Sequence, residues 1–157
     1  MKNQKKIIFI TGAAGFIGFH FCKKLFKNKS QNTIIGFDNL NNYYSKKLKT
    51  DRLKELEKLS LKSTNNWKFI KGDLENNNLL IKTFEKYKPE IVVHLAAQAG
   101  VRYSLDHPFS YINSNILGFS HILECCRIYN VKNLIYASSS SVYGGNTRTP
   151  FKEKDNV

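Results

Sequence analysis

Short apolar runs alternate with longer amphipathic stretches along this chain. The runs are four or five residues long and often contain β-branched residues, which is typical of strands buried on both faces of a parallel sheet. The stretches between them carry apolar residues at helical spacing. The sequence therefore predicts five strands separated by four helical segments. The predicted strands cover residues 7–10, 33–37, 67–71, 91–95 and 133–137.

The sequence also predicts which face of each helical segment meets the core. In residues 46–61 we expect Leu53, Leu56 and Leu59 to face it, and in residues 79–87 Leu80, Phe84 and Tyr87. After the first strand, Ile17, Phe21 and Leu25 recur at intervals of four, and we expect them to form the buried face. A later helix is predicted over residues 109–129, and its apolar residues step by four and three. We expect this stripe to face the core as well; it consists of Ile112, Ile116, Phe119, Leu123 and Cys126.

This alternation predicts an α/β fold of the Rossmann type, in which a doubly wound parallel sheet has right-handed crossovers. With the usual strand order 3-2-1-4-5, a ligand crevice would lie outside the C-terminal ends of the first and fourth strands. Residues 1–157 are enough for one domain with its own core. We therefore treat the chain as a single nucleotide-binding domain.

Three glycines follow the first strand with the spacing G-x-x-G-x-x-G. Gly12 permits a tight turn, Gly15 lets backbone N–H groups approach a pyrophosphate, and Gly18 lets the next helix pack closely. The N-terminus of that helix would favour phosphates. Asp38 ends the second strand about twenty residues later, where a carboxylate binds an adenosine ribose. Because it would repel a 2′-phosphate, Asp38 favours NAD over NADP.

Small and polar residues follow the other strands too. Asp73 comes after the third strand, and it either caps the next helix or contacts an adenine. Residues 96–100 follow the fourth strand, where their backbone could lie close to a cofactor, and residues 138–141 are serines after the fifth. His94, inside the fourth strand, is expected to be a buried histidine with a hydrogen-bond partner. All these strand ends fall on one edge of the predicted sheet.

Together these motifs resemble the extended short-chain dehydrogenase/reductase family of nucleotide-sugar enzymes. Residues 39–44 (NLNNYY) and 97–108 (AQAGVRYSLDHP) most resemble UDP-glucuronate 4-epimerases. The resemblance implies an NAD-dependent 4-epimerase that oxidises the sugar at C4 and returns the hydride to the opposite face. Another nucleotide-sugar epimerase or dehydratase, or a non-catalytic NAD-binding module, is the alternative. The family resemblance rests on residues 11–18 (TGAAGFIG), 36–40 (GFDNL), 72–74 (GDL), 94–98 (HLAAQ), 113–118 and 136–144 (YASSSSVYG).

The resemblance also implies individual roles. Ser139 would be the catalytic serine that hydrogen-bonds the sugar O4, and Ser139, Ser140 and Arg102 would contact the UDP-sugar substrate. For Arg102 an ordinary surface arginine is the alternative. The residues implied to hold NAD are Gly12, Gly15, Phe16, Ile17, Gly18, Asp38, Asn39, Asp73, Leu74, Ala96, Ala97, Gln98, Asn115 and Ser138.

The chain departs from the family in one respect. The family has a Tyr-x-x-x-Lys pair on the helix after the serine strand, but here Tyr143 is followed at that interval by Thr147. Tyr43 and Lys47 have the spacing but lie on the adenosine side, which we interpret as coincidence. We therefore expect an N-terminal fragment, inactive by itself, in which the later strands and the substrate domain are missing.

Composition adds little to this hypothesis. The chain has 25 Lys and Arg against 12 Asp and Glu, a formal net charge of +13. Its lysines are spread out and no Arg-rich segment accompanies them, so we expect a solvated surface and no nucleic-acid partner. The three cysteines lack metal-binding spacing, and no apolar run has membrane length. We therefore expect a cytoplasmic protein without a metal. Residues 109–129 are a candidate for a homodimer contact, although a stripe that faces the core would explain their apolar positions without a partner.

Overall fold

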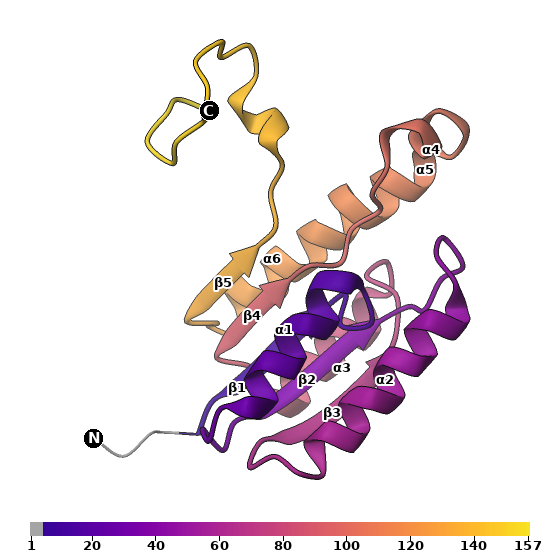
Figure 1. Ribbon diagram of the computed structural model, residues 1–157, viewed down its shortest axis with the longest axis vertical. Coiled ribbons are helices and arrows are strands. Elements are labelled where there is room, and N and C mark those ends of the chain that lie inside the picture. The colour runs from indigo at the N-terminus through magenta and orange to yellow at the C-terminus, as the bar shows by residue number, and fades with distance from the viewer. Residues whose placement is uncertain (1–4) are drawn as a thin grey trace.

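A computed structural model of the protein describes residues 5–157 and shows a sheet covered by helices on both faces (Figure 1). Within this range the sheet has five parallel strands in the order β3-β2-β1-β4-β5. This order confirms the predicted Rossmann-type topology. The strands are β1 (Ile7–Thr11), β2 (Thr33–Asp38), β3 (Asn66–Lys71), β4 (Ile91–His94) and β5 (Asn133–Tyr136).

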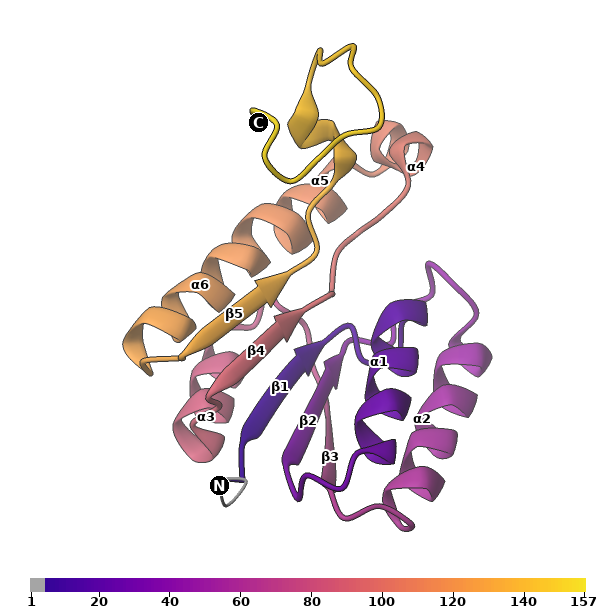
Figure 2. The ribbon, with the colours of Figure 1, turned by 60° about the vertical axis from the view of Figure 1, so that its left-hand side comes forward.

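Four longer helices form the outer layers (Figure 2). The pair α1 (Phe16–Lys27) and α2 (Lys46–Ser60) packs together on one face of the sheet. The pair α3 (Asn77–Tyr87) and α6 (Gly118–Ile128) packs together on the other. Among the helices of the described residues, none combines the length and apolarity that a membrane span requires.

The connection from β4 to β5 is the longest in the described chain. It begins with the short helices α4 (Val101–Asp106) and α5 (Pro108–Tyr111). A π-helical turn over Ile112–Leu117 joins α5 to α6. After β5 comes a 3-10 turn, Ser140–Tyr143, and the residues after this turn extend away from the sheet (Figure 1).

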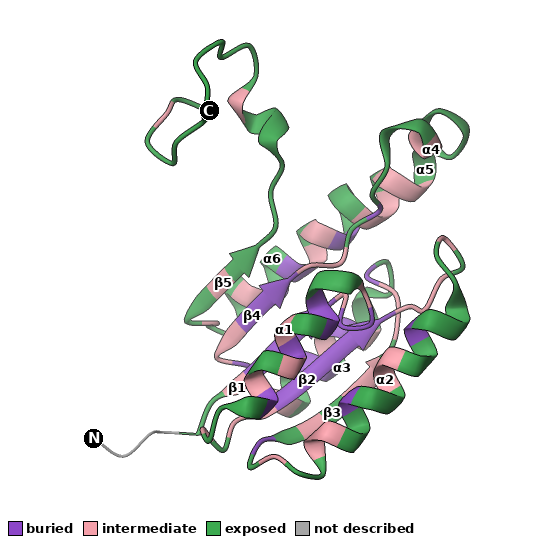
Figure 3. Ribbon diagram, viewed as in Figure 1, coloured by how far each residue is buried: buried purple, intermediate pink, exposed green. Residues whose placement is uncertain are grey.

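The core lies in two layers, one on each side of the sheet. Successive side chains of β1 point to opposite faces, so Ile8 and Ile10 pack against α1 and α2, while Phe9 packs against α3 and α6. The Phe9 ring lies 5.6 Å from that of Phe37 and 5.1 Å from that of Phe84. The central strands are buried and the edge strand β5 is largely exposed (Figure 3).

The predicted core face of α1 is wrong by one position. Ile17 is exposed, and Phe21 and Leu25 are only partly buried. Gly18 sets the rotation of the helix, because a Cβ atom there would overlap the carbonyl oxygen of Gly12 in the preceding turn. Gly18 therefore faces the turn after β1. The side chains buried with it are Phe19, Cys22 and Phe26.

The stripe predicted for the later helix is also wrong for most of its members. Ile112, Ile116 and Leu123 are exposed, whereas Phe119 and Cys126 are partly buried. The reason is the π-helical turn, which holds more residues than an α-helical turn and so rotates α6 about its axis. Spacing counted from Ile112 no longer follows one face. The residues that α6 buries are Gly118, Ile122 and Cys125.

Candidate functional site

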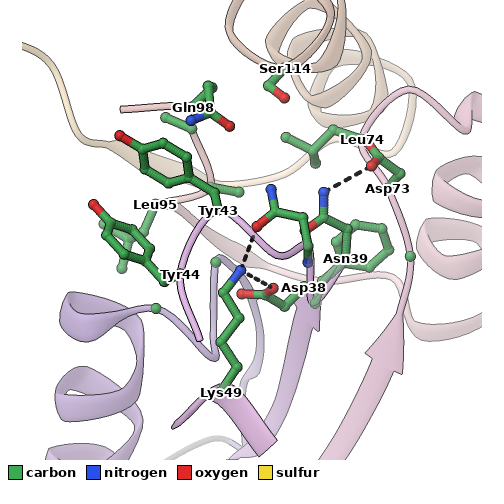
Figure 4. Close-up of a pocket in the computed structure, with 17 residues that line it drawn as sticks. Asp38, Asn39, Tyr43, Tyr44, Lys49, Asp73, Leu74, Leu95, Gln98 and Ser114 are labelled. Carbon is green, nitrogen blue, oxygen red and sulfur yellow. Dashed lines mark hydrogen bonds and ion pairs between the residues drawn. The ribbon is translucent and has the colours of Figure 1, made fainter. Parts of the chain in front are cut away.

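A pocket lies at the edge of the sheet where the C-terminal ends of β1, β2, β3 and β4 meet (Figure 4). This is the edge at which open α/β sheets bind their ligands. Side chains from the loop after β2 and from α2, together with Ser114 of the π-helical turn, complete the lining. The structure brings nine of the predicted site residues into this pocket, namely Gly12, Gly15, Asp38, Asn39, Asp73, Leu74, Ala96, Ala97 and Gln98.

The glycine turn lies at one wall of the pocket. Gly12 has a φ of 69°, and a Cβ atom there would lie 2.8 Å from the backbone nitrogen of Ala96. The Gly15 N–H donates to the Gly12 carbonyl at 3.0 Å, and α1 begins at the next residue. Within the described residues no side chain caps α1. Its first N–H groups are therefore available to an anion.

Asp38 joins the glycine turn to the end of β2. The residue is buried, and its Oδ2 atom accepts a hydrogen bond from the Ala14 N–H at 3.1 Å. Its Oδ1 atom accepts one from the Leu40 N–H at 2.9 Å. These contacts fix the carboxylate at the pocket wall, where the sequence predicts a ribose contact.

Lys49 is a pocket residue that the sequence interpretation missed. Its buried side chain reaches from α2 toward Asp38, with Nζ 3.6 Å from the Asp38 Oδ1 atom, and donates to Asn41 Oδ1 at 2.9 Å (Figure 4). An ammonium group has three N–H donors, so Lys49 can bind a further acceptor. Its spacing could have revealed it, because Lys49 precedes the core-facing Leu53 and Leu56 by four and seven positions.

Asp73 lines the pocket from the loop after β3. The Asn39 Nδ2 atom donates to Asp73 Oδ2 at 2.9 Å, which joins the loops after β2 and β3. The alternative that Asp73 caps the next helix is wrong, because the Asn76 side chain caps α3 by accepting from the Leu79 N–H at 3.0 Å. Asp73 thus remains a pocket residue.

Thr11 and His94 lie next to the pocket-lining residues Leu95 and Ala96. Thr11 Oγ1 accepts hydrogen bonds from the backbone N–H groups of Leu95 and Ala96, both at 3.1 Å, and lies 2.8 Å from His94 Nδ1. The hydroxyl proton must therefore go to Nδ1, which makes His94 neutral with its proton on Nε2. Burial lowers the pKa of His94 to about 4. The prediction of a buried, hydrogen-bonded histidine is confirmed.

Asn115 supports the pocket from outside its lining. Its Oδ1 atom accepts from the Gln98 N–H at 2.8 Å, and its Nδ2 atom donates to the Gln98 carbonyl at 3.0 Å. Both backbone groups of Gln98 are thus held by one side chain of the π-helical turn. Asn115 therefore fixes where the loop after β4 passes the pocket.

The other predicted residues lie outside the pocket lining. Ser139 is exposed beyond β5, where its Oγ atom accepts from the Ser141 N–H at 3.2 Å. Arg102 is exposed and lines a second hollow next to the pocket. Their roles in a substrate site stay predictions. The remaining residues outside the lining are Phe16, Ile17, Gly18, Ser138 and Ser140.

Tyr43 and Lys47 do not form a catalytic pair in the structure. Lys47 is 87% exposed and donates to Asp51 at 2.7 Å. Burial, followed by the neighbouring hydroxyls of Tyr44 and other tyrosines, raises the pKa of Tyr43. A tyrosine that acts as a base needs its pKa lowered, so these contacts agree with interpreting the spacing as coincidence.

Comparison with known proteins identifies the family of this domain. Residues 9–157 match the family model described as GDP-mannose 4,6-dehydratase. The chain belongs to this NAD-dependent epimerase/dehydratase family. The match covers the glycine turn, all four strand ends of the pocket and the serines after β5.

Three members of the epimerase/dehydratase family illustrate the similarity. Protein CapI of Staphylococcus aureus is 55% identical over 96% of this chain, which spans 42% of CapI. UDP-glucuronate 4-epimerase 4 of Arabidopsis thaliana is 44% identical over 98% of the chain, which spans 33% of that protein. The crystal structure of UDP-glucose 4-epimerase from Bifidobacterium longum, in complex with NAD+ and UDP, superposes with a TM-score of 0.75 at 27% identity. That alignment covers 94% of this chain and 41% of the other. The chain therefore spans less than half the length of each of these relatives.

Proposed function

We propose that this chain binds NAD and provides the cofactor site of a nucleotide-sugar 4-epimerase whose substrate is UDP-glucuronate. The observation that carries the proposal is the meeting of the glycine turn with Asp38 and Lys49 in one pocket. The 44% identity to a UDP-glucuronate 4-epimerase supports the substrate, and the NAD+ bound by the Bifidobacterium enzyme supports the cofactor.

The pocket residues fit a dinucleotide. The backbone between Gly12 and Gly18 offers N–H groups and a helix N-terminus to a pyrophosphate. Asp38 accepts hydrogen bonds and Lys49 donates them, so the pair complements the two hydroxyls of a ribose. Asp73 lies at the wall where the sequence predicts an adenine contact. The pyrophosphate, the adenosine ribose and the adenine thus each have a candidate partner in the chain.

The chain's own residues would bind and orient the reactants. NAD, when bound, supplies the acceptor and donor of a hydride. Ser139 would hydrogen-bond the sugar O4 and so fix the hydroxyl that loses its proton. Arg102, a cation beside the pocket, would bind the phosphate or carboxylate of the substrate.

A nucleotide-sugar dehydratase is the second candidate, because the matched family model is itself described as a dehydratase. Both activities need the same cofactor pocket.

A homodimer is also part of our proposal. Its contact would use the exposed apolar side chains of residues 109–129, which include Phe109, Ile112, Ile116, Leu123 and Ile128.

The cofactor assignment predicts that the 157-residue chain binds NAD at least about tenfold more tightly than NADP, because Asp38 would repel a 2′-phosphate. Isothermal titration with each cofactor measures this ratio. A chain that unfolds cooperatively on heating but binds neither cofactor would contradict the proposed function.

Incubation of the chain with NAD and UDP-glucuronate should yield no UDP-galacturonate, because Ser139 has no Tyr-x-x-x-Lys partner among these residues. Turnover would refute that expectation.

Lys49 offers a sharper test of the ribose contact. Replacing Lys49 by methionine keeps the length of the buried stem but removes its donors, and should weaken NAD binding about tenfold. Lys47→Met is the matched control, because Lys47 lies half a turn earlier on α2 with its side chain 87% exposed. Equal NAD affinities of the two variants in the same titration would exclude Lys49 from the site.

A further inference from the structure

Two loops that flank the glycine turn approach each other beside the pocket. Residues 39–45 follow β2, and the second loop, residues 95–106, follows β4 and includes the short helix α4. Since β2 and β4 are the two neighbours of β1 in the sheet, a contact between these loops reaches from one side of the glycine turn to the other. The proposed function does not use this contact.

The contact is made by aromatic rings. The rings of Tyr43 and Tyr103 lie 4.8 Å apart between centroids, at an angle of 60°. The Tyr103 ring also packs against the His107 ring, with 4.2 Å between the two centroids. The Tyr111 hydroxyl donates to the Ala99 carbonyl at 2.9 Å and so holds the second loop in place. Tyr43 therefore meets an ordered cluster rather than a single mobile side chain.

The backbone of the second loop accommodates Tyr43 closely. Gly100 has a φ of 94°, and a Cβ atom there would overlap the Tyr43 hydroxyl. The next atom that it would approach is Tyr43 Cζ, at 3.5 Å. A side chain larger than that of glycine at this position would therefore force the Tyr43 ring to move from its present place.

The Tyr43 side chain separates two spaces. It lines the cofactor pocket together with Asp38 and Gln98, and it also lines the second hollow, next to Arg102. Figure 4 shows Tyr43 and Tyr44 on the loop that follows Asp38. The start of that loop is fixed, because the Leu40 N–H donates to Asp38 Oδ1 at 2.9 Å. The position of Tyr43 therefore depends on Asp38, the residue predicted to bind the ribose.

We propose that Tyr43 is a positioning residue that retains bound NAD by closing the pocket wall against Tyr103. The inference rests on the proposed function. A cofactor that is reduced and reoxidised within one turnover has to stay bound throughout, so a slow release is useful to such an enzyme. Release of the dinucleotide requires the Tyr43–Tyr103 contact to open.

The rate at which the cofactor dissociates tests this role. Bound NADH is displaced by excess NAD and its fluorescence is followed by stopped flow. Tyr43→Ala should release NADH about three- to tenfold faster than wild type, the range expected for losing an aromatic pair, whereas Tyr43→Phe should keep the wild-type rate. Tyr136→Ala removes a tyrosine of β5 that packs against Phe119 outside the pocket lining, and it should leave the rate of NADH release unchanged.

A double-mutant cycle separates the contact from a general loss of structure. Tyr103→Ala should speed release as Tyr43→Ala does, and the double variant should be no faster than either, because all three lack the same contact. Gly100→Ala should also speed release, and adding Tyr43→Phe should slow it again, since this change removes the hydroxyl that the new Cβ atom overlaps.

The outcomes distinguish the inference from the proposed function. If wild type does not bind NADH, the proposed function is wrong and the inference falls with it. If wild type binds and Tyr43→Ala releases NADH as slowly as Tyr136→Ala, only the inference is wrong. Fully additive effects of Tyr43→Ala and Tyr103→Ala would also overturn it, because the two side chains would then act separately.

Discussion

Replacing Gly12 by alanine is expected to abolish NAD binding and to lower the free energy of unfolding by about 3 kcal/mol. Two costs add. The φ of 69° is unfavourable for any residue with a Cβ atom, and the new atom would lie 2.8 Å from the Ala96 nitrogen and 2.9 Å from the Leu95 carbonyl. Backbone atoms cannot rotate away as a side chain can, so the turn has to shift and the pyrophosphate contacts shift with it.

Gly144 provides a matched control for this prediction. Its φ is also positive, at 54°, but a Cβ atom there would have no heavy atom within 4 Å. Gly144→Ala should therefore show only the conformational cost of its backbone, about 1–3 kcal/mol at φ 54° and ψ −129°, and leave NAD affinity unchanged. Urea unfolding and NAD titration measure both quantities. Equal losses of stability in the two variants would show that crowding by the end of β4 does not matter at Gly12.

Acidification from pH 7 to pH 4 should remove about 3 kcal/mol of stability through His94 alone. In the unfolded chain this histidine has its ordinary pKa of 6.5, whereas burial lowers the pKa to about 4 in the folded protein. Between these values the unfolded state binds more protons. The stabilisation is therefore complete above about pH 6.5 and is lost progressively as the pH falls toward 4. Urea unfolding at a series of pH values measures the loss.

Other groups titrate in this range, so the contribution of His94 has to be separated from theirs. His94→Asn keeps an acceptor for the Thr11 hydroxyl but cannot gain a proton near neutral pH. Stability of this variant should decline less steeply between pH 6.5 and 4 than that of wild type. Parallel profiles for the two proteins would mean that the His94 ring becomes protonated without cost in the folded state.

Local sequence features predicted the strands, their order and most of the pocket. Apolar runs identify buried strands, and parallel topology then places every strand end on one edge, so Gly12, Asp38 and Asp73 could be grouped from the sequence alone. Nothing in that grouping needs the detailed packing of side chains. The location of the pocket and most of the residues that line it follow from the order of the strands.

The faces predicted for α2 and α3 do pack on the core, but the rotation of α1 and of α6 could not be predicted in the same way. In α1 it is set by the contact of Gly18 with the Gly12 carbonyl, and in α6 by the π-helical turn before it. Neither cause appears in a count of apolar residues. The contact between Tyr43 and Tyr103 was missed for a related reason, because it joins the irregular loop after β2 to α4, a helix too short to show a periodic pattern.

The π-helical turn also implies that this domain tolerates insertions and deletions unequally. Removing one residue from Ile112–Leu117 would change the spacing between α5 and α6, so both helices could keep their present contacts only if the turn became α-helical. The deletion would also displace Asn115, the clamp on the Gln98 backbone. The residues beyond Tyr143 include no buried side chain and no proposed site residue, so they have no such constraint. Length variants of this domain should therefore accumulate beyond Tyr143 and be rare between α5 and α6.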